Sequence, residues 1–160
     1  MSKHQMQHAD REVTDQAVVS NLLKTGKYMA IAMCDQDQPY VVVLSCGYDE
    51  ANKCFYFHCA KKGRKTDVIM KNPRVCGTIV EDHGYVKGDC SHNYRSAVVW
   101  GTMTLVDDLN EKKHAMDVLL RQLEGDPEVI RPQFIKDEKS VMGVGILKLV
   151  VEHIDCKGNI

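Results

Sequence analysis

Short apolar runs separated by polar turns recur along most of the chain, a pattern that predicts β-strands rather than long helices. The runs are residues 28–34, 40–46, 54–59, 74–80, 94–106 and 141–154. The close spacing of the first three is typical of an antiparallel meander. Six antiparallel strands favour a small closed barrel, because closure leaves no exposed strand edge. The pattern therefore predicts a mainly β fold, a six-stranded antiparallel split barrel with a few helices.

Helical spacing appears in three segments. Thr14 is the expected N-cap of a helix whose apolar stripe includes Leu22 and Leu23 and which ends at Gly26. A short helix over about residues 66–71 should close at Asn72-Pro73, because the residue before proline resists the helical region. Asp108 with Glu111 resembles a capping box, so a third helix should begin there and end at Gly125.

Two polar segments are expected to lack regular structure. Residues 81–93 are polar and contain glycine, which predicts a long loop. Residues 126–140 contain Pro127 and Pro132 and are expected to form a loop with at most one helical turn. In the last strand, Gly143 and Gly145 indicate a bulge or a close backbone approach.

The length and charge of the chain limit its class. Its 160 residues suffice for one domain but not comfortably for two, so residues 1–160 are expected to form a single domain, with residues 1–12 as a flexible or docking arm. The 21 basic and 22 acidic residues give a net charge of −1, which argues against a nucleic-acid partner. The N-terminus lacks the apolar segment of a signal peptide, and no apolar run approaches a membrane span.

The seven cysteines favour a cytoplasmic protein with reduced thiols, because their number is odd and no secretion signal is present. None of them forms a Cys-x-x-Cys pair, and most are expected to be small buried side chains. His83, Cys90 and His92 share one segment but lack metal-ligand spacing, so no metal site is predicted.

The segment Gly63-Arg64-Lys65 carries the clearest chemical signal. It follows a strand that ends at His58-Cys59 and precedes a helix that starts near Thr66. The positive end of a helix and its free backbone N–H groups bind anions, and arginine can grip a phosphate with two parallel hydrogen bonds. From spacing alone a solvated basic turn remains an alternative. The spacing matches neither a Walker loop nor a dinucleotide-binding glycine motif.

Four motifs, one of which contains this segment, occur in order, and with the helix expected after Asp108 they carry a family resemblance over roughly residues 11–125. They are Pro39-Tyr-Val-Val-Val-Leu-Ser-Cys-Gly-Tyr-Asp49, Tyr56-Phe-His-Cys-Ala-x-x-Gly-Arg-Lys-x-Asp67, Asn72-Pro-Arg-Val-Cys76 and Tyr94-Arg-Ser-Ala-Val-Val-Trp-Gly101. The chain strongly resembles the pyridoxamine 5'-phosphate oxidase-like FMN-binding split barrels, and within them the 5-nitroimidazole-resistance (Nim-type) flavoproteins. The resemblance implies a homodimer with FMN at the subunit interface.

The same resemblance assigns site residues. Arg64 and Lys65 would hold the FMN phosphate, and Val43, Leu44 and Ser45 would lie along the flavin edge. His58 would lie near both the flavin and a small bound ligand, as the catalytic residue. Two further side chains would come from a strand near the interface and reach the partner's flavin, namely Tyr94 and Trp100.

Each of three single residues also has a plain structural explanation. Without the family context, His58 at a strand end is an ordinary surface or hydrogen-bonded residue; within it, an imidazole side chain suits proton delivery. Cys59 is expected to be a buried spacer rather than a redox thiol. Trp100 is expected to serve core or interface packing whether or not it touches the flavin.

Three functions remain open at this stage. The first is an FMN-dependent oxidoreductase that reduces small electron-poor compounds, such as nitro-aromatic molecules. The second is a non-enzymatic flavin-binding or electron-carrier protein. The third, motivated by the histidines, is a haem-handling split barrel. Pyridoxamine phosphate oxidation itself is not expected, because residues 147–160 lack the basic, aromatic segment that binds that substrate.

Overall fold

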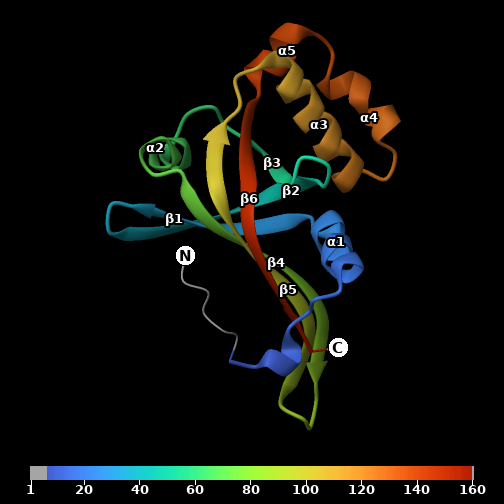
Figure 1. Cartoon of the computed structure of the whole chain (residues 1–160). Coiled ribbons are helices and arrows are strands. Elements are labelled where there is room, and N and C mark those ends of the chain that lie inside the picture. The colour runs from blue at the N-terminus through green and yellow to red at the C-terminus, as the bar shows by residue number, and fades with distance from the viewer. Residues whose placement is uncertain (1–6, 160) are drawn as a thin grey trace.

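Alternating buried and outward-facing side chains define the inside of a barrel. The computed structural model describes residues 7–159, and Met29, Ile31 and Met33 alternate on its first strand between outward-facing neighbours. The strands are β1 (Tyr28–Asp35), β2 (Gln38–Asp49), β3 (Cys54–Cys59), β4 (Arg74–Val86), β5 (Ser91–Leu105) and β6 (Gly145–Gly158). They pair in the order β1-β2-β3-β6-β5-β4, and antiparallel pairing of β1 with β4 closes the ring (Figure 1). The predicted six-stranded split-barrel fold is confirmed.

Helices cover parts of the outer surface. They are α1 (Gln16–Thr25), α2 (Arg64–Lys71), α3 (Leu109–Leu123), α4 (Pro127–Phe134) and α5 (Glu138–Gly143), preceded by the 3-10 turn Ala9–Arg11. Figure 1 shows α3, α4 and α5 grouped at one end of the barrel, with α2 standing apart from them. Glu12 forms an isolated bridge with Lys157 of β6, so the last residue of the predicted arm pairs with the barrel. Residues 1–6 of that arm lie outside the described residues.

Two apolar clusters hold these layers together. The barrel interior contains Phe55 and Phe57 of β3 with Leu147 and Leu149 of β6. A second cluster lies outside the barrel, where α3 packs on the outward-facing side chains of β3 and β6; it includes Cys54, Tyr56, Ile146, Met116 and Leu119. Strand β3 is therefore buried on both faces, except at His58.

Several local predictions need correction. The N-cap of α1 is Asp15 rather than Thr14, because the Asp15 carboxylate accepts hydrogen bonds from the backbone N–H groups of Ala17 and Val18. Residues 81–93 are not a long loop, because β4 and β5 continue through them as a twisted hairpin with a register shift. The predicted capping residue Asp108 is confirmed, since its side chain accepts from the Glu111 N–H at 2.8 Å.

The segment 126–140 is mainly helical, contrary to the prediction. Pro127 occupies the first turn of α4, where a missing N–H costs nothing, and Asp126 caps the helix through the Glu128 N–H. Asp137 caps α5 in the same way. At the start of β6, the close approach is at Gly145, where an added Cβ would lie 2.4 Å from the Cys59 carbonyl oxygen, and not at Gly143.

A polar contact joins the β2–β3 turn to α3. The buried Asp49 carboxylate lies 2.6 Å from His114 Nε2 and accepts a 2.7 Å hydrogen bond from the Asn52 side chain. Burial alone would raise the pKa of Asp49, but the hydrogen bonds from Asn52 and His114 outweigh it and lower the pKa below its usual value. The ionised form is therefore favoured in the folded state.

Replacing Asp49 with asparagine should reduce the free energy of unfolding at pH 7 by about 1–2 kcal/mol, because charge-assisted hydrogen bonds become neutral ones. A lowered folded-state pKa gives stability that is present above the unfolded pKa and is lost as pH falls through the folded value. The difference between wild type and variant should therefore shrink below about pH 4. Urea unfolding at pH 7, 5 and 3.5 measures it, with Asp37→Asn on an exposed turn as the control; a pH-independent difference would contradict this account.

Candidate functional site

His58 is the one exposed residue of β3, and its side chain faces outward from the barrel. It pairs with Ile146 of β6 on one side. On the other side, the β2–β3 ladder ends at the Cys46–Phe57 pair, so the next positions, Ser45 and His58, lie where the two strands separate. The fold therefore brings these two predicted site residues to one place on the outer surface.

The predicted phosphate segment forms the first turn of α2. Gly63 is its N-cap, and Arg64 and Lys65 are inside the helix rather than in the loop before it. Gly63 has φ of 141°, a value that favours glycine, and apart from its neighbours in the chain no residue lies within 4 Å of where its Cβ would be. The Thr66 hydroxyl donates to the Gly63 carbonyl at 2.7 Å and so fixes the turn. The first N–H groups of a helix lack partners within it, so this turn presents donors to an anion.

Arg64 connects α2 with the β1–β2 hairpin. Its guanidinium carbon lies 4.5 Å from the centroid of the Tyr40 ring, and a terminal nitrogen is 3.7 Å from the Asp35 carboxylate. The side chain is still 56% exposed. These contacts orient the guanidinium while leaving N–H donors for a further acceptor, as a phosphate grip requires. The residues present therefore fit a phosphate group.

Cys59 lies between His58 and this turn but is buried. Burial raises the pKa of its thiol, and the positive charges of Lys65 and Lys112 only partly oppose that rise. Lys112 is itself buried, and its ammonium group donates to the carbonyls of Met142 and Val144. A thiol with a raised pKa is a poor nucleophile, which agrees with a spacer role for Cys59.

The other predicted residues are distributed around the barrel. Val43 faces outward and is 63% exposed, whereas the Leu44 side chain packs against the interior cluster. Trp100 faces outward on β5, with its ring centroid 5.5 Å from that of His153. Tyr94 lies near the start of β5, opposite Asp82 on the β4–β5 hairpin. Within one chain, neither Trp100 nor Tyr94 is brought to the α2 turn by an observed contact.

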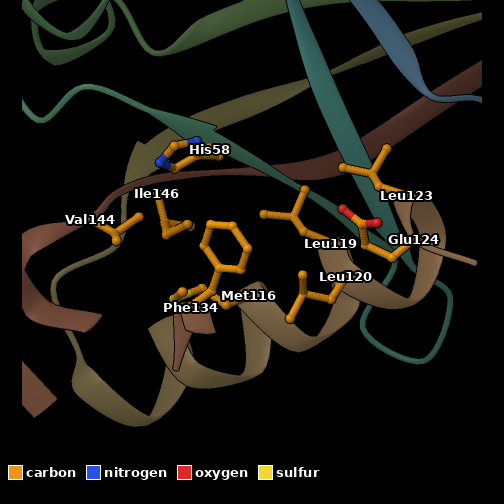
Figure 2. Close-up of a pocket in the computed structure, with 9 residues that line it drawn as sticks. All are labelled: His58, Met116, Leu119, Leu120, Leu123, Glu124, Phe134, Val144 and Ile146. Atoms are coloured by element: carbon orange, nitrogen blue, oxygen red, sulfur yellow. The ribbon is translucent and has the colours of Figure 1, made fainter. Parts of the chain in front are cut away.

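An apolar cavity of about 240 Å³ opens beside His58 (Figure 2). It lies between α3, α4 and the outer faces of β3 and β6, and none of the α2 residues lines it. Figure 2 shows the Phe134 ring among the aliphatic side chains, with His58 at one edge and Glu124 toward another. The aliphatic lining consists of Met116, Leu119, Leu120, Leu123, Val144 and Ile146.

This cavity was not predicted from the sequence, because residues 127–134, which form α4, were expected to be part of a loop. The signal was present in Asp126-Pro127, which is typical of an N-cap followed by the first helical residue. Of the predicted site residues, only His58 lines the cavity.

Within residues 7–159, the His, Cys, Asp and Glu side chains form no group of three that could hold a metal ion. His83 and His92 instead lie near Glu81 and Asp82, at 3.4 and 3.1 Å. Over the same range, every helix is too short or too polar to cross a bilayer.

The strand order and the closed ring define a six-stranded split β-barrel. The family model described as pyridoxamine 5'-phosphate oxidase matches residues 15–157, and the chain belongs to this family. No curated protein matches the chain.

Solved structures agree with this assignment. A candidate 5-nitroimidazole antibiotic resistance protein from Bacteroides thetaiotaomicron is 25% identical, with a TM-score of 0.77 over 97% of this chain and 95% of that one. The flavocytochrome Anf3 from Azotobacter vinelandii is 18% identical, with a TM-score of 0.80 over 98% of this chain and 73% of that one. A FAD-binding protein from Mesorhizobium loti is 19% identical, with a TM-score of 0.65 over 91% and 96%. The last two share the fold.

Proposed function

We propose that this protein binds FMN and reduces small electron-poor compounds. The observation that carries the proposal is the basic turn at the start of α2, which begins five residues after the outward-facing His58. Arg64, Lys65 and the free N–H groups of the turn suit one terminal phosphate, as FMN has. Family membership and the flavin-binding and nitroimidazole-resistance names of similar structures support this choice.

The protein's own groups would bind and orient the reactants. FMN would supply the hydride chemistry when bound. For a nitro compound, one hydride and one proton give the nitroso product and water, and a nicotinamide nucleotide restores the two electrons. His58, exposed on the same surface, would hold the proton at a ring nitrogen. Ser45, beside it, would contribute a hydroxyl toward the flavin edge.

The absorbance spectrum of the purified protein tests the cofactor. Bands near 375 and 450 nm, or uptake of added FMN at micromolar affinity, are the expected results. Failure to bind FMN would refute the proposal. A Soret band after haem addition, without flavin binding, would favour the haem-handling alternative. The similar structure named flavocytochrome Anf3 is the reason to include this test.

Steady-state oxidation of NADH and NADPH with a panel of nitro-aromatic and quinone acceptors separates enzyme from carrier. The oxidoreductase should turn over repeatedly with at least one acceptor. A tightly bound flavin that never turns over would favour the non-enzymatic carrier.

We also propose that two copies associate through the outer face of β1, β2 and β4. Four large apolar side chains are exposed there, between 59% and 63%: Tyr28, Val41, Val43 and Val80. Exposed apolar patches of this kind mark protein interfaces. In such a dimer, Trp100 and Tyr94 of one copy would approach the flavin of the other, although no observed contact joins either residue to the α2 turn within one chain.

Placing charges on this face should break the dimer. Val41→Asp combined with Val80→Asp should give a monomer in sedimentation-velocity experiments, because two carboxylates would be buried unpaired in the contact. Val129→Asp, on an equally exposed position of α4 (64%), should leave the dimer intact. A wild-type monomer at all concentrations would contradict the proposal.

A further inference from the structure

The cavity between α3 and α4 has the size of a ligand site. Its volume of about 240 Å³ is larger than an engineered cavity of roughly 150 Å³ that binds benzene. A molecule with one aromatic ring and a small substituent therefore fits.

The lining selects against charged ligands. Seven of the nine lining side chains are apolar, and His58 and Glu124 are the two polar ones. A ligand carboxylate would lose its hydration without meeting a lysine or arginine on the lining, and it would meet the negative charge of Glu124. A permanent cation would also lose its hydration to the aliphatic wall. The chemistry of the walls thus favours an uncharged molecule with a single polar group.

The α4 wall supplies an aromatic surface. None of the described α4 residues is buried, and Arg131 links the helix to Asp117 of α3 while also pairing with Glu128 on α4 itself. Phe134 at its end is 53% exposed although its ring stands among the lining side chains (Figure 2). An aromatic ligand would cover this ring, because aromatic pairs at 4.5–7 Å stabilise each other beyond simple burial.

We propose that this cavity binds the electron acceptor, an uncharged molecule of aromatic-ring size whose polar group is turned toward His58. The inference rests on the proposed function and deepens it, because it gives the acceptor a place separate from the α2 phosphate turn. His58 belongs to both places: it lines the cavity and faces outward beside Ser45. The acceptor's polar group and the flavin edge would therefore meet at this side chain.

Chemical-shift titrations of the 15N-labelled, FMN-loaded protein test the proposal without a reductant, so no turnover occurs. Nitrobenzene is the uncharged probe and benzoate its charged counterpart of similar size. Nitrobenzene should shift amide signals of α3 and α4 in a saturable way, and benzoate should bind at least tenfold more weakly. Equal binding of the two probes, or shifts that map outside α3 and α4, would overturn the proposal.

Two variants locate the site. Leu120→Trp should fill the cavity and raise the Kd for nitrobenzene at least tenfold, whereas Val129→Trp, the same type of change at a position of α4 outside the lining, should not. If Leu120→Trp does not fold, Phe134→Ala takes its place, since its helix buries no residue and the lost ring should also raise the Kd. Unchanged affinity in the folded filling variant would place the ligand elsewhere.

Titrating the flavin-free protein separates this inference from the proposed function. Competition between FMN and nitrobenzene would mean that the cavity holds the flavin itself, which overturns the acceptor site and keeps the flavoprotein. A protein that binds nitrobenzene but not FMN would remove the acceptor role together with the proposed function. Simultaneous binding of both supports the two-site arrangement.

Discussion

Replacing Arg64 and Lys65 together with alanine should weaken FMN binding roughly a hundredfold to ten-thousandfold. Each charged hydrogen bond contributes about 1.5–3 kcal/mol, so losing two costs about 3–6 kcal/mol. Both side chains lie in the first turn of α2, where the helix dipole and the free N–H groups act on the same phosphate. Fluorescence titration of FMN measures the loss directly.

Two controls separate a specific phosphate grip from general charge. The double substitution Lys61→Ala and Lys62→Ala removes the same charge from the segment just before α2, where no helix presents its N–H groups. It should reduce the affinity for FMN much less. Riboflavin, which has no phosphate, should bind wild type and the Arg64/Lys65 variant about equally. Unchanged FMN affinity in the Arg64/Lys65 variant would show that the phosphate lies elsewhere.

Replacing His58 with glutamine should reduce turnover of the best acceptor by roughly 10²- to 10⁴-fold, the contribution typical of a positioned acid or base. Flavin should remain bound, because the phosphate turn of α2 is unaltered. His58 is the only exposed residue of β3, so the substitution removes no buried contact of that strand. Stopped-flow reoxidation of the reduced protein by the acceptor separates this step from reduction by the nicotinamide nucleotide.

His83→Gln is the matched control, because it makes the same change at a histidine on the β4–β5 hairpin. It should leave turnover near the wild-type value. Full activity in the His58 variant would remove this residue from proton transfer, and loss of bound flavin would assign it to cofactor binding instead.

The strands could be predicted from sequence because each is a short apolar run bounded by polar turns. The run over residues 28–34 is an example, and the structure then shows which of its side chains, Met29, Ile31 and Met33, face the interior. The extended β4–β5 hairpin escaped prediction for the opposite reason. Residues such as Asp82 and Tyr85 are exposed on a ribbon outside the barrel, so no apolar pattern marks them as strand.

The ends of the helices were harder to predict than their presence. Thr14 and Asp15 are both good caps, and only the observed hydrogen bonds from Ala17 and Val18 decide between them. The helix α2 begins at Arg64, two residues before the predicted start at Thr66, so Arg64 and Lys65 both lie on the helix. This change strengthens the phosphate hypothesis, because both residues now share the turn whose N–H groups are free.

Site residues that belong to one continuous segment could be predicted from the sequence. Site residues that come from separate helices and strands could not. His58 and Arg64 are six residues apart, so strand, turn and helix fix their relation. The cavity needs Leu119 of α3, Phe134 of α4 and Ile146 of β6, which meet only after barrel closure. The sequence offers no spacing that joins them.

The position of β6 has a consequence for the synthesis of this chain. Strand β6 hydrogen-bonds to β3 on one side and to β5 on the other. Until β6 has been synthesised, one edge of each of these two strands therefore has no hydrogen-bonding partner. About 50 residues separate the end of β5 from the end of β6, which corresponds to roughly 3–10 s of translation at 5–20 residues per second. Strand β3, with the sequence Cys-Phe-Tyr-Phe-His-Cys, is aggregation-prone while that edge is open. Expression yield should therefore depend on chaperones that shield this strand during translation.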